Sequence, residues 1–154
     1  MKAALIATFV VSSAAAIAVV SAQTTAPPVV EVYKSPTCGC CSKWIDHLAE
    51  EGFKVRVKDV PDPELDALKT RSGIPDQAQS CHTALVGGYA IEGHVPAAEV
   101  KRLLAERPAI AGIAVPGMPI GSPGMEVPGR PAQPYRVIAF DKKGATSVFA
   151  TYDR

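Results

Sequence analysis

The sequence lacks an excess of charge of either sign and contains no run of basic residues. Its 16 lysines and arginines balance 15 aspartates and glutamates, which gives a formal net charge of +1. Because binding to nucleic-acid phosphates requires clustered positive charge, this balance argues against a nucleic-acid partner. The chain, at 154 residues, is also too short for two large domains. With 47% hydrophobic residues it still has enough apolar material for a core.

Long hydrophobic runs are missing except at the start of the chain. Lys2 is followed by an apolar run at residues 3–20 and then by the small residues Ser21 and Ala22. A charged start, an apolar middle and small residues at the exit are typical of a secretory signal peptide. We therefore predict a signal peptide at residues 1–22, a periplasmic mature protein and no membrane association after cleavage. An uncleaved membrane anchor is the alternative.

After a predicted flexible leader at residues 23–28, residues 29–154 predict a single α/β domain. Strands are expected at 29–33, 53–58, 83–86 and 89–93, and helices from the cysteine-rich segment to Gly52, from Asp62 to Ser72 and from Pro96 to Glu106. Residues 53–58 alternate apolar and cationic side chains, which predicts a strand with one buried face. The order strand, helix, strand, helix, hairpin, helix predicts a thioredoxin-like mixed sheet with flanking helices.

Prolines and glycines gather late in the chain. The composition of residues 107–134 argues against a long helix or a central strand, so we predict a loop there. Its methionine-bearing part is assigned to residues 113–134. Two β-rich stretches, 135–140 and 145–152, then predict a closing C-terminal hairpin.

Four cysteines are the most informative residues, and three of them lie within four positions. Cys38 and Cys41 form a C-x-x-C pair where a strand meets a helix, the spacing of redox-active dithiols. The N-terminal end of a helix stabilises a thiolate, which prepares the thiol to attack a disulfide or to bind metal. One interpretation is therefore a thiol-disulfide oxidoreductase, with Cys38 as nucleophile and Cys41 as resolving thiol. Two plain disulfides are a further possibility.

The two other cysteines, Cys40 and Cys81, favour metal binding. A bridge between Cys40 and its neighbour Cys41 would be strained. Cys81 lies just before the strand that starts at Thr83, and in a thioredoxin-like layout this segment faces the N-terminus of the first helix. Four thiolates in one pocket repel each other unless cations compensate them. Soft thiolates select Cu(I), zinc or iron–sulfur clusters. About four Cu(I) ions would bring the total charge of the four thiolates and the metal to about zero, whereas one Zn(II) would leave it at about −2. We therefore predict several Cu(I) per chain, with zinc as the weaker alternative.

The proline-rich loop contributes two methionines, each preceded by a glycine. Met118 and Met125 carry soft, uncharged thioethers that can bind Cu(I) without losing a proton. Both side chains could instead fill gaps in the core. We treat them as candidate copper ligands.

The three histidines differ as candidate ligands. His94 follows a predicted strand and is a candidate ligand, particularly for Cu(II), which prefers imidazole. His82 adjoins Cys81 but is a weaker candidate, because neighbouring side chains often point apart. His47 is expected to be exposed on the first helix.

Several segments together resemble the CopG-like family of small periplasmic copper-resistance proteins. They are Cys38-Gly39-Cys40-Cys41 with Trp44, the segment 80–83, the segment 92–96 and the segment 117–125. The resemblance extends over residues 29–152. It implies a thioredoxin-like fold in which the four cysteines hold a Cu(I) cluster, with the methionine loop and His94 nearby. It further implies a role in copper resistance, redox interconversion of Cu(I) and Cu(II), and another periplasmic copper protein as partner.

Overall fold

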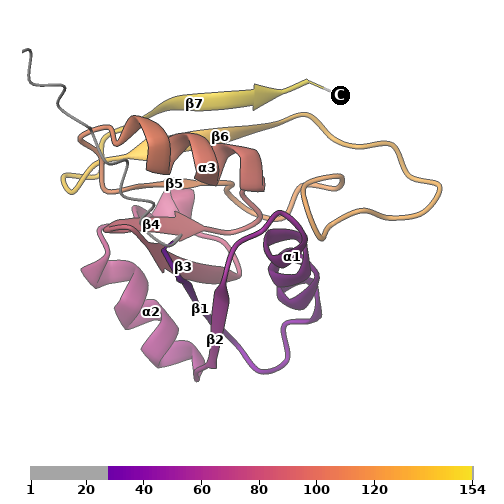
Figure 1. The fold of residues 1–154 in the computed structure, drawn as a ribbon, viewed down its shortest axis with the longest axis horizontal. Coiled ribbons are helices and arrows are strands. Elements are labelled where there is room, and N and C mark those ends of the chain that lie inside the picture. The colour runs from indigo at the N-terminus through magenta and orange to yellow at the C-terminus, as the bar shows by residue number, and fades with distance from the viewer. Residues whose placement is uncertain (1–27, 154) are drawn as a thin grey trace, which may run out of the picture.

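The computed structural model describes residues 28–153, so the predicted signal peptide and most of the predicted leader lie outside the described residues. The elements in chain order are β1 (Val30–Lys34), α1 (Gly39–Glu50), β2 (Val55–Asp59), α2 (Asp62–Arg71), the 3-10 turn η1 (Asp76–Ala78), β3 (His82–Val86), β4 (Tyr89–Glu92), α3 (Ala97–Glu106), β5 (Gly112–Ala114), β6 (Tyr135–Phe140) and β7 (Thr146–Tyr152) (Figure 1). The predicted α/β class, with a mixed sheet, flanking helices and a closing hairpin, is confirmed. No helix within the described range is long and apolar enough to cross a bilayer.

The seven strands of residues 28–153 form one sheet in the order β2-β1-β3-β4-β5-β6-β7. β1 runs parallel to β2 and antiparallel to β3, and the register pairs Lys34 at the end of β1 with His82 at the start of β3. The chain that leaves β1 and the chain that enters β3 therefore lie side by side. This register brings the segment of Cys38 next to Cys81.

The side chains of the sheet alternate between two apolar layers, as the period of two in a strand requires. One layer contains Val30 and Val32 of β1 together with Trp44 and Leu48 of α1 and the apolar side of α3. The opposite layer contains Leu65 and Leu68 of α2 and residues of β1 and β3 that face away from α1. Helices α1 and α3 thus cover one face of the sheet and α2 covers the other.

The structure corrects the prediction that residues 107–134 contain no central strand. Residues 112–114 form β5, which lies between β4 and β6 in the sheet, and Ile113 is fully buried. Because β5 is only three residues long, it fits between Pro108 and Pro116, and neither proline interrupts its hydrogen bonds. The methionine-bearing loop therefore begins after Ala114 rather than at residue 113.

The strand predicted at residues 53–58 is present as β2, but its buried face is incomplete. β2 is an edge strand, and Val57 is 43% exposed. Its cationic residues Arg56 and Lys58 form ion pairs with Glu31 of β1. The alternating pattern therefore identified a strand correctly, whereas the position of β2 at the edge leaves its apolar side only partly covered.

The central position of β5 makes Gly112 sensitive to substitution. A Cβ atom at Gly112 would lie 1.9 Å from the Ala90 carbonyl oxygen and 2.6 Å from the ring of Phe140. We expect Gly112→Ala to lower the free energy of unfolding by about 2–3 kcal/mol in urea denaturation, because the interior cannot accommodate the added methyl. Gly39→Ala is the control, since a Cβ there meets no atom within 4 Å. Equal stability of the two variants would contradict the placement of β5.

Candidate metal centre

The first part of the centre is built where β1 ends and α1 begins. Cys38 is the N-cap residue of α1 in an extended conformation, and Cys40 and Cys41 lie in the first turn, which contains no acidic residue. The free backbone N–H groups of this turn and the positive end of the helix dipole favour negative charge. Thiolates at these positions are therefore stabilised.

All four cysteine sulfurs converge, with every pair of sulfurs within 4.8 Å. The Sγ atoms of Cys38 and Cys40 are 3.6 Å apart, and those of Cys41 and Cys81 are 3.7 Å apart. Cys38 and Cys41 form a disulfide, whereas Cys40 and Cys81 are free thiols. In this form the centre has one disulfide and two thiols. Reduction of the disulfide would supply four thiols at the same place.

His94 points into this cluster. Its Nε2 atom lies 3.2 Å from Cys81 Sγ, and its Nδ1 atom lies 2.8 Å from the Pro123 carbonyl oxygen. Because a carbonyl can only accept, Nδ1 carries the ring proton, and Nε2 directs its lone pair toward the sulfur. Burial lowers the pKa of His94, which favours this neutral form. The imidazole is thus oriented as a metal ligand would be.

His82 also faces the cluster, which corrects the expectation that its side chain diverges from that of Cys81. Its Nδ1 atom lies 3.3 Å from Cys81 Sγ, and the ring packs 4.4 Å from the Trp44 ring, centroid to centroid. Burial, reinforced by the neighbouring His94, lowers the pKa of His82. Cys81, His82 and His94 therefore form a second group of potential ligands.

Sequence reasoning underrated His82 because the alternation of a strand does not extend to Cys81, which lies in a bend before β3. The period-two pattern within β3 did hold the relevant signal. His82 shares a strand face with Ala84 and Val86, and this face packs against α1. The alternation of β3 therefore predicts that His82, its first residue, faces α1, the helix that carries the other cysteines.

His47 is not simply exposed, contrary to expectation. Its side chain is half-buried, and Nε2 accepts a hydrogen bond of 3.1 Å from the backbone N–H of Ala97. His47 therefore satisfies one of the free N–H groups at the start of α3 and joins α1 to α3. Its role is in packing rather than at the cluster.

Trp44 and Gly124 connect α1 to the other parts of the centre. The buried Trp44 ring donates a 2.8 Å hydrogen bond from Nε1 to the Val95 carbonyl, next to His94. A Cβ at Gly124 would lie 2.8 Å from the Trp44 backbone nitrogen and 3.2 Å from the Cys40 carbonyl oxygen, at a backbone φ of +83°. Only glycine allows the loop to approach the first turn of α1 this closely.

The methionine loop, the orange segment on the side of α1 in Figure 1, is held at two points beside the cysteines. Gly117 contacts the segment before Cys81 through Gln79 and Ser80, and Gly124 contacts α1. Met118 and Met125 immediately follow these two glycines. Met118 is 50% exposed and Met125 is half-buried. The loop thus lies against the centre, while coordination by the two thioethers stays a prediction.

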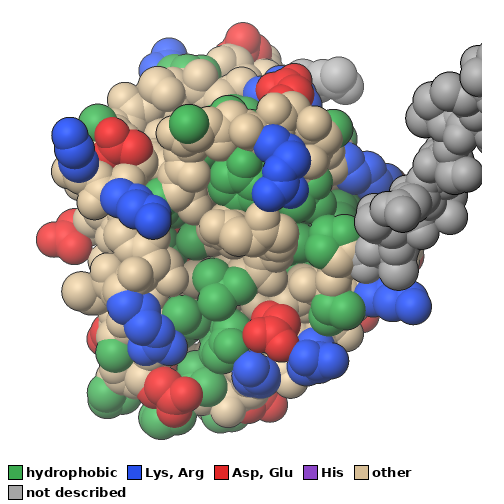
Figure 2. Space-filling view, turned by 60° about the vertical axis from the view of Figure 1, so that its left-hand side comes forward, with side chains coloured by type: hydrophobic (Ala, Val, Ile, Leu, Met, Phe, Trp, Pro, Cys, Tyr) green, Lys and Arg blue, Asp and Glu red, His purple; other side chains and the backbone are tan. Residues whose placement is uncertain are grey.

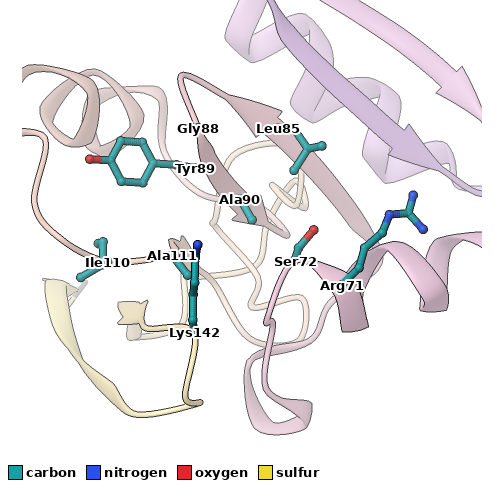
Figure 3. Close-up of a pocket in the computed structure, with 9 residues that line it drawn as sticks. All are labelled: Arg71, Ser72, Leu85, Gly88, Tyr89, Ala90, Ile110, Ala111 and Lys142. Carbon is teal, nitrogen blue, oxygen red and sulfur yellow. The ribbon is translucent and has the colours of Figure 1, made fainter.

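A separate pocket of about 420 Å³ lies beside Gly88 and Tyr89, at the turn between β3 and β4 (Figure 3). Its lining residues are Arg71, Ser72, Leu85, Gly88, Tyr89, Ala90, Ile110, Ala111 and Lys142. It includes none of the cysteines, histidines or methionines of the predicted site. The predicted metal ligands therefore all lie outside this pocket.

Figure 2 shows one face of the molecule, on which charged side chains of both signs are interspersed.

Two solved structures, described as copper resistance protein CopG in forms 1 and 2, resemble this chain. Form 1 shares 43% identity with a TM-score of 0.77, covering 84% of this chain and 100% of that chain. Form 2 shares 44% identity with a TM-score of 0.75, covering 82% of this chain and 99% of that chain. This chain belongs to the CopG family. The family predicted from its motifs is thus confirmed.

A sequence-family model described as "Protein of unknown function, DUF411" matches residues 78–125. This range includes Cys81, His94, Met118 and Met125 but begins after the cysteines of α1. No curated protein matches the chain. The match to CopG therefore rests on the solved structures, which span both parts of the centre.

The free thiol of Cys81 offers a direct test of the geometry. Burial, followed by repulsion from Cys40, raises the pKa of Cys81 to about 11. Alkylation requires the thiolate, so in the form with Cys38 and Cys41 bonded we expect the Cys81 rate to rise about tenfold per pH unit from about pH 7 to 10. Iodoacetamide labelling with peptide mass spectrometry measures this rate for Cys81 separately from Cys40. A plateau near pH 9 would show that Cys81 is not buried as described.

Proposed function

We propose that the chain binds copper as a Cu(I)-thiolate cluster and thereby contributes to copper resistance. The observation that carries this proposal is the convergence of four cysteine sulfurs at the N-terminal end of α1. Two buried imidazoles beside Cys81 add nitrogen ligands. Thiolates select Cu(I), and imidazoles also suit Cu(II). Membership in a family whose solved members are described as copper resistance proteins supports copper as the metal.

Charge compensation favours several Cu(I) ions over one zinc ion. Once reduced, four thiolates within 4.8 Å would place about four negative charges in a partly buried site. Several monovalent ions, bridged by shared sulfurs, cancel this charge, whereas a single Zn(II) leaves about half of it. The burial that keeps Cys81 protonated also means that copper must displace its proton. We therefore propose several Cu(I) per chain, with His94, Met118 and Met125 as flanking ligands.

The disulfide beside the two free thiols supports redox interconversion of copper as a further part of the proposal. Two Cu(I) ions can each give one electron to the Cys38–Cys41 disulfide, whose S–S bond breaks as two protons are taken up. The products are two Cu(II) ions and two thiols, and the reverse reaction regenerates Cu(I) and the disulfide. His82 and His94 are suited to hold Cu(II) after such a step. The alternative function is a thiol-disulfide oxidoreductase that uses the same two cysteines on a protein substrate.

The proposed setting is the periplasm. Its basis is the apolar start of the sequence, which favours a signal peptide at residues 1–22 and a leader at 23–28, followed by one metal-binding domain at 29–154. In an oxidising compartment, free thiols persist when a metal or partner holds them. We propose that copper is supplied or removed by another periplasmic copper protein and that the mature chain does not associate with the membrane.

Anaerobic Cu(I) titration of the reduced protein tests the cluster. We expect saturation at several Cu(I) per chain with loss of all four reactive thiols, because the sulfurs are shared between ions. Cys40→Ser should lower the copper stoichiometry while it leaves the Cys38–Cys41 dithiol able to form its disulfide. Ser42→Ala, an exposed change in the same helix, is the matched control.

Two results would contradict the cluster. The first is an unchanged copper stoichiometry in Cys40→Ser, which would show that the third thiol is not a bridging ligand. The second is weak copper uptake by the unmodified chain together with rapid reduction of protein disulfides, which would favour the oxidoreductase alternative.

A further inference from the structure

A buried ion pair lies next to Cys81 without being part of the sulfur cluster. Lys69 of α2 and Glu92 of β4 contact each other through Nζ and Oε1, and their side chains are 4% and 0% exposed. Lys69 belongs to α2, which covers one face of the sheet, whereas α1 and its cysteines lie on the other face (Figure 1). Glu92 follows Ile91, which packs on the α1 side, so the alternation of β4 turns Glu92 toward α2. Burial of two charges is costly unless further hydrogen bonds satisfy them.

Those further hydrogen bonds go to residues on either side of Cys81. Glu92 Oε1 accepts from the Ser80 backbone N–H at 2.6 Å, and Glu92 Oε2 accepts from Thr83 Oγ1 at 2.6 Å. Lys69 Nζ donates to the Ser80 carbonyl oxygen at 3.1 Å and to Thr83 Oγ1 at 3.2 Å. The ammonium group therefore has three acceptors, counting Glu92. The ion pair thus holds both polar backbone groups of Ser80.

The backbone at Cys81 needs such an anchor because it lies outside the strand ladder. Cys81 is in a bend, and β3 begins only at His82. The Ser80 carbonyl belongs to the peptide group that joins Ser80 to Cys81, so its hydrogen bond to Lys69 fixes the orientation of that peptide plane. The backbone of Gly93 also packs directly against Ser80, because a Cβ at Gly93 would lie only 2.6 Å from Ser80 Cβ.

We infer that the Lys69–Glu92 ion pair is a positioning element that aims the Cys81 thiol at the other three sulfurs. This inference rests on the proposed copper function for its purpose, although the positioning itself does not require copper. Neither residue is a copper ligand. A buried ion pair is a poor source of stability, because apolar replacements of similar volume are often neutral or stabilising. Its value here is the fixed direction of Cys81.

The test measures how closely Cys81 is held to Cys41, with no metal present. In the background Cys38→Ser/Cys40→Ser only Cys41 and Cys81 remain, with sulfurs 3.7 Å apart. The effective concentration of these two thiols is obtained from disulfide formation in glutathione redox buffers, quantified by peptide mass spectrometry. We expect Lys69→Met/Glu92→Leu to reduce it about tenfold, because the released backbone no longer directs the thiol.

An exposed ion pair provides the matched control. Lys101 and Glu51 form a 2.7 Å pair between α3 and the end of α1, with side chains about half exposed. Lys101→Met/Glu51→Leu should leave the effective concentration unchanged. Thermal unfolding is followed for both double variants, because a purely structural role would change the melting temperature but not the thiol proximity in the folded chain.

A cooperative unfolding transition combined with an unchanged effective concentration in Lys69→Met/Glu92→Leu would overturn the inference. If that variant does not fold, Glu92→Gln is used instead, since it keeps the shape but replaces one acceptor oxygen with a donor. A severalfold loss of effective concentration in folded Glu92→Gln supports the positioning role, and an unchanged value overturns it.

A second arm separates this inference from the proposed function. With all four cysteines present, the same double variant should bind Cu(I) about tenfold more weakly in competition with bicinchoninate, because one sulfur is misplaced. If the unsubstituted chain itself fails to bind Cu(I), the copper proposal fails while the thiol-proximity result still decides the positioning role. If copper affinity is unchanged although thiol proximity is lost, Cys81 placement does not limit binding, and the purpose assigned to the pair is wrong.

Discussion

The centre depends on the crowding of four sulfurs, and this crowding follows from the register of two antiparallel strands. The end of β1 pairs with the start of β3. The turn that leads into α1 and the bend that precedes β3 therefore lie next to each other, beyond the same ends of these two strands. Cys38, Cys40 and Cys41 come from the first, and Cys81 comes from the second. Thiolates this close repel each other unless cations compensate their charge or a disulfide forms. Metal binding and disulfide exchange are therefore the two kinds of chemistry available to the centre.

The surroundings support both kinds of chemistry. The N-terminal end of α1 stabilises negative sulfur, and the Pro123 carbonyl fixes the tautomer of His94 so that its lone pair meets Cys81. Trp44 and Gly124 join α1 to the segments that carry His94 and the methionines. On the other face of the sheet, charged groups hold the backbone beside Cys81. The centre is thus supported from several separate parts of the chain.

Sequence patterns predicted most of the element order and the cysteine set, because both depend on local signals. Hydrophobic periodicity and glycine turns marked the strands, and cysteine spacing identified the cluster. The failures have a common origin in tertiary context. β5 is too short to show a period between its flanking prolines, His47 gains a partner only when α3 packs against α1, and His82 faces the cluster because Cys81 lies in a bend rather than in the strand. The roles of Lys69 and Glu92 depend on contacts between distant elements.

Copper K-edge X-ray absorption of the reduced chain, loaded with Cu(I) without oxygen, tests the central claim most directly. Bridging thiolates predict a first shell dominated by sulfur together with a copper–copper scattering path, since each shared sulfur brings two ions close. A first shell of nitrogen and oxygen, or a sulfur shell with no copper–copper path, would contradict a polynuclear cluster held by the four cysteines.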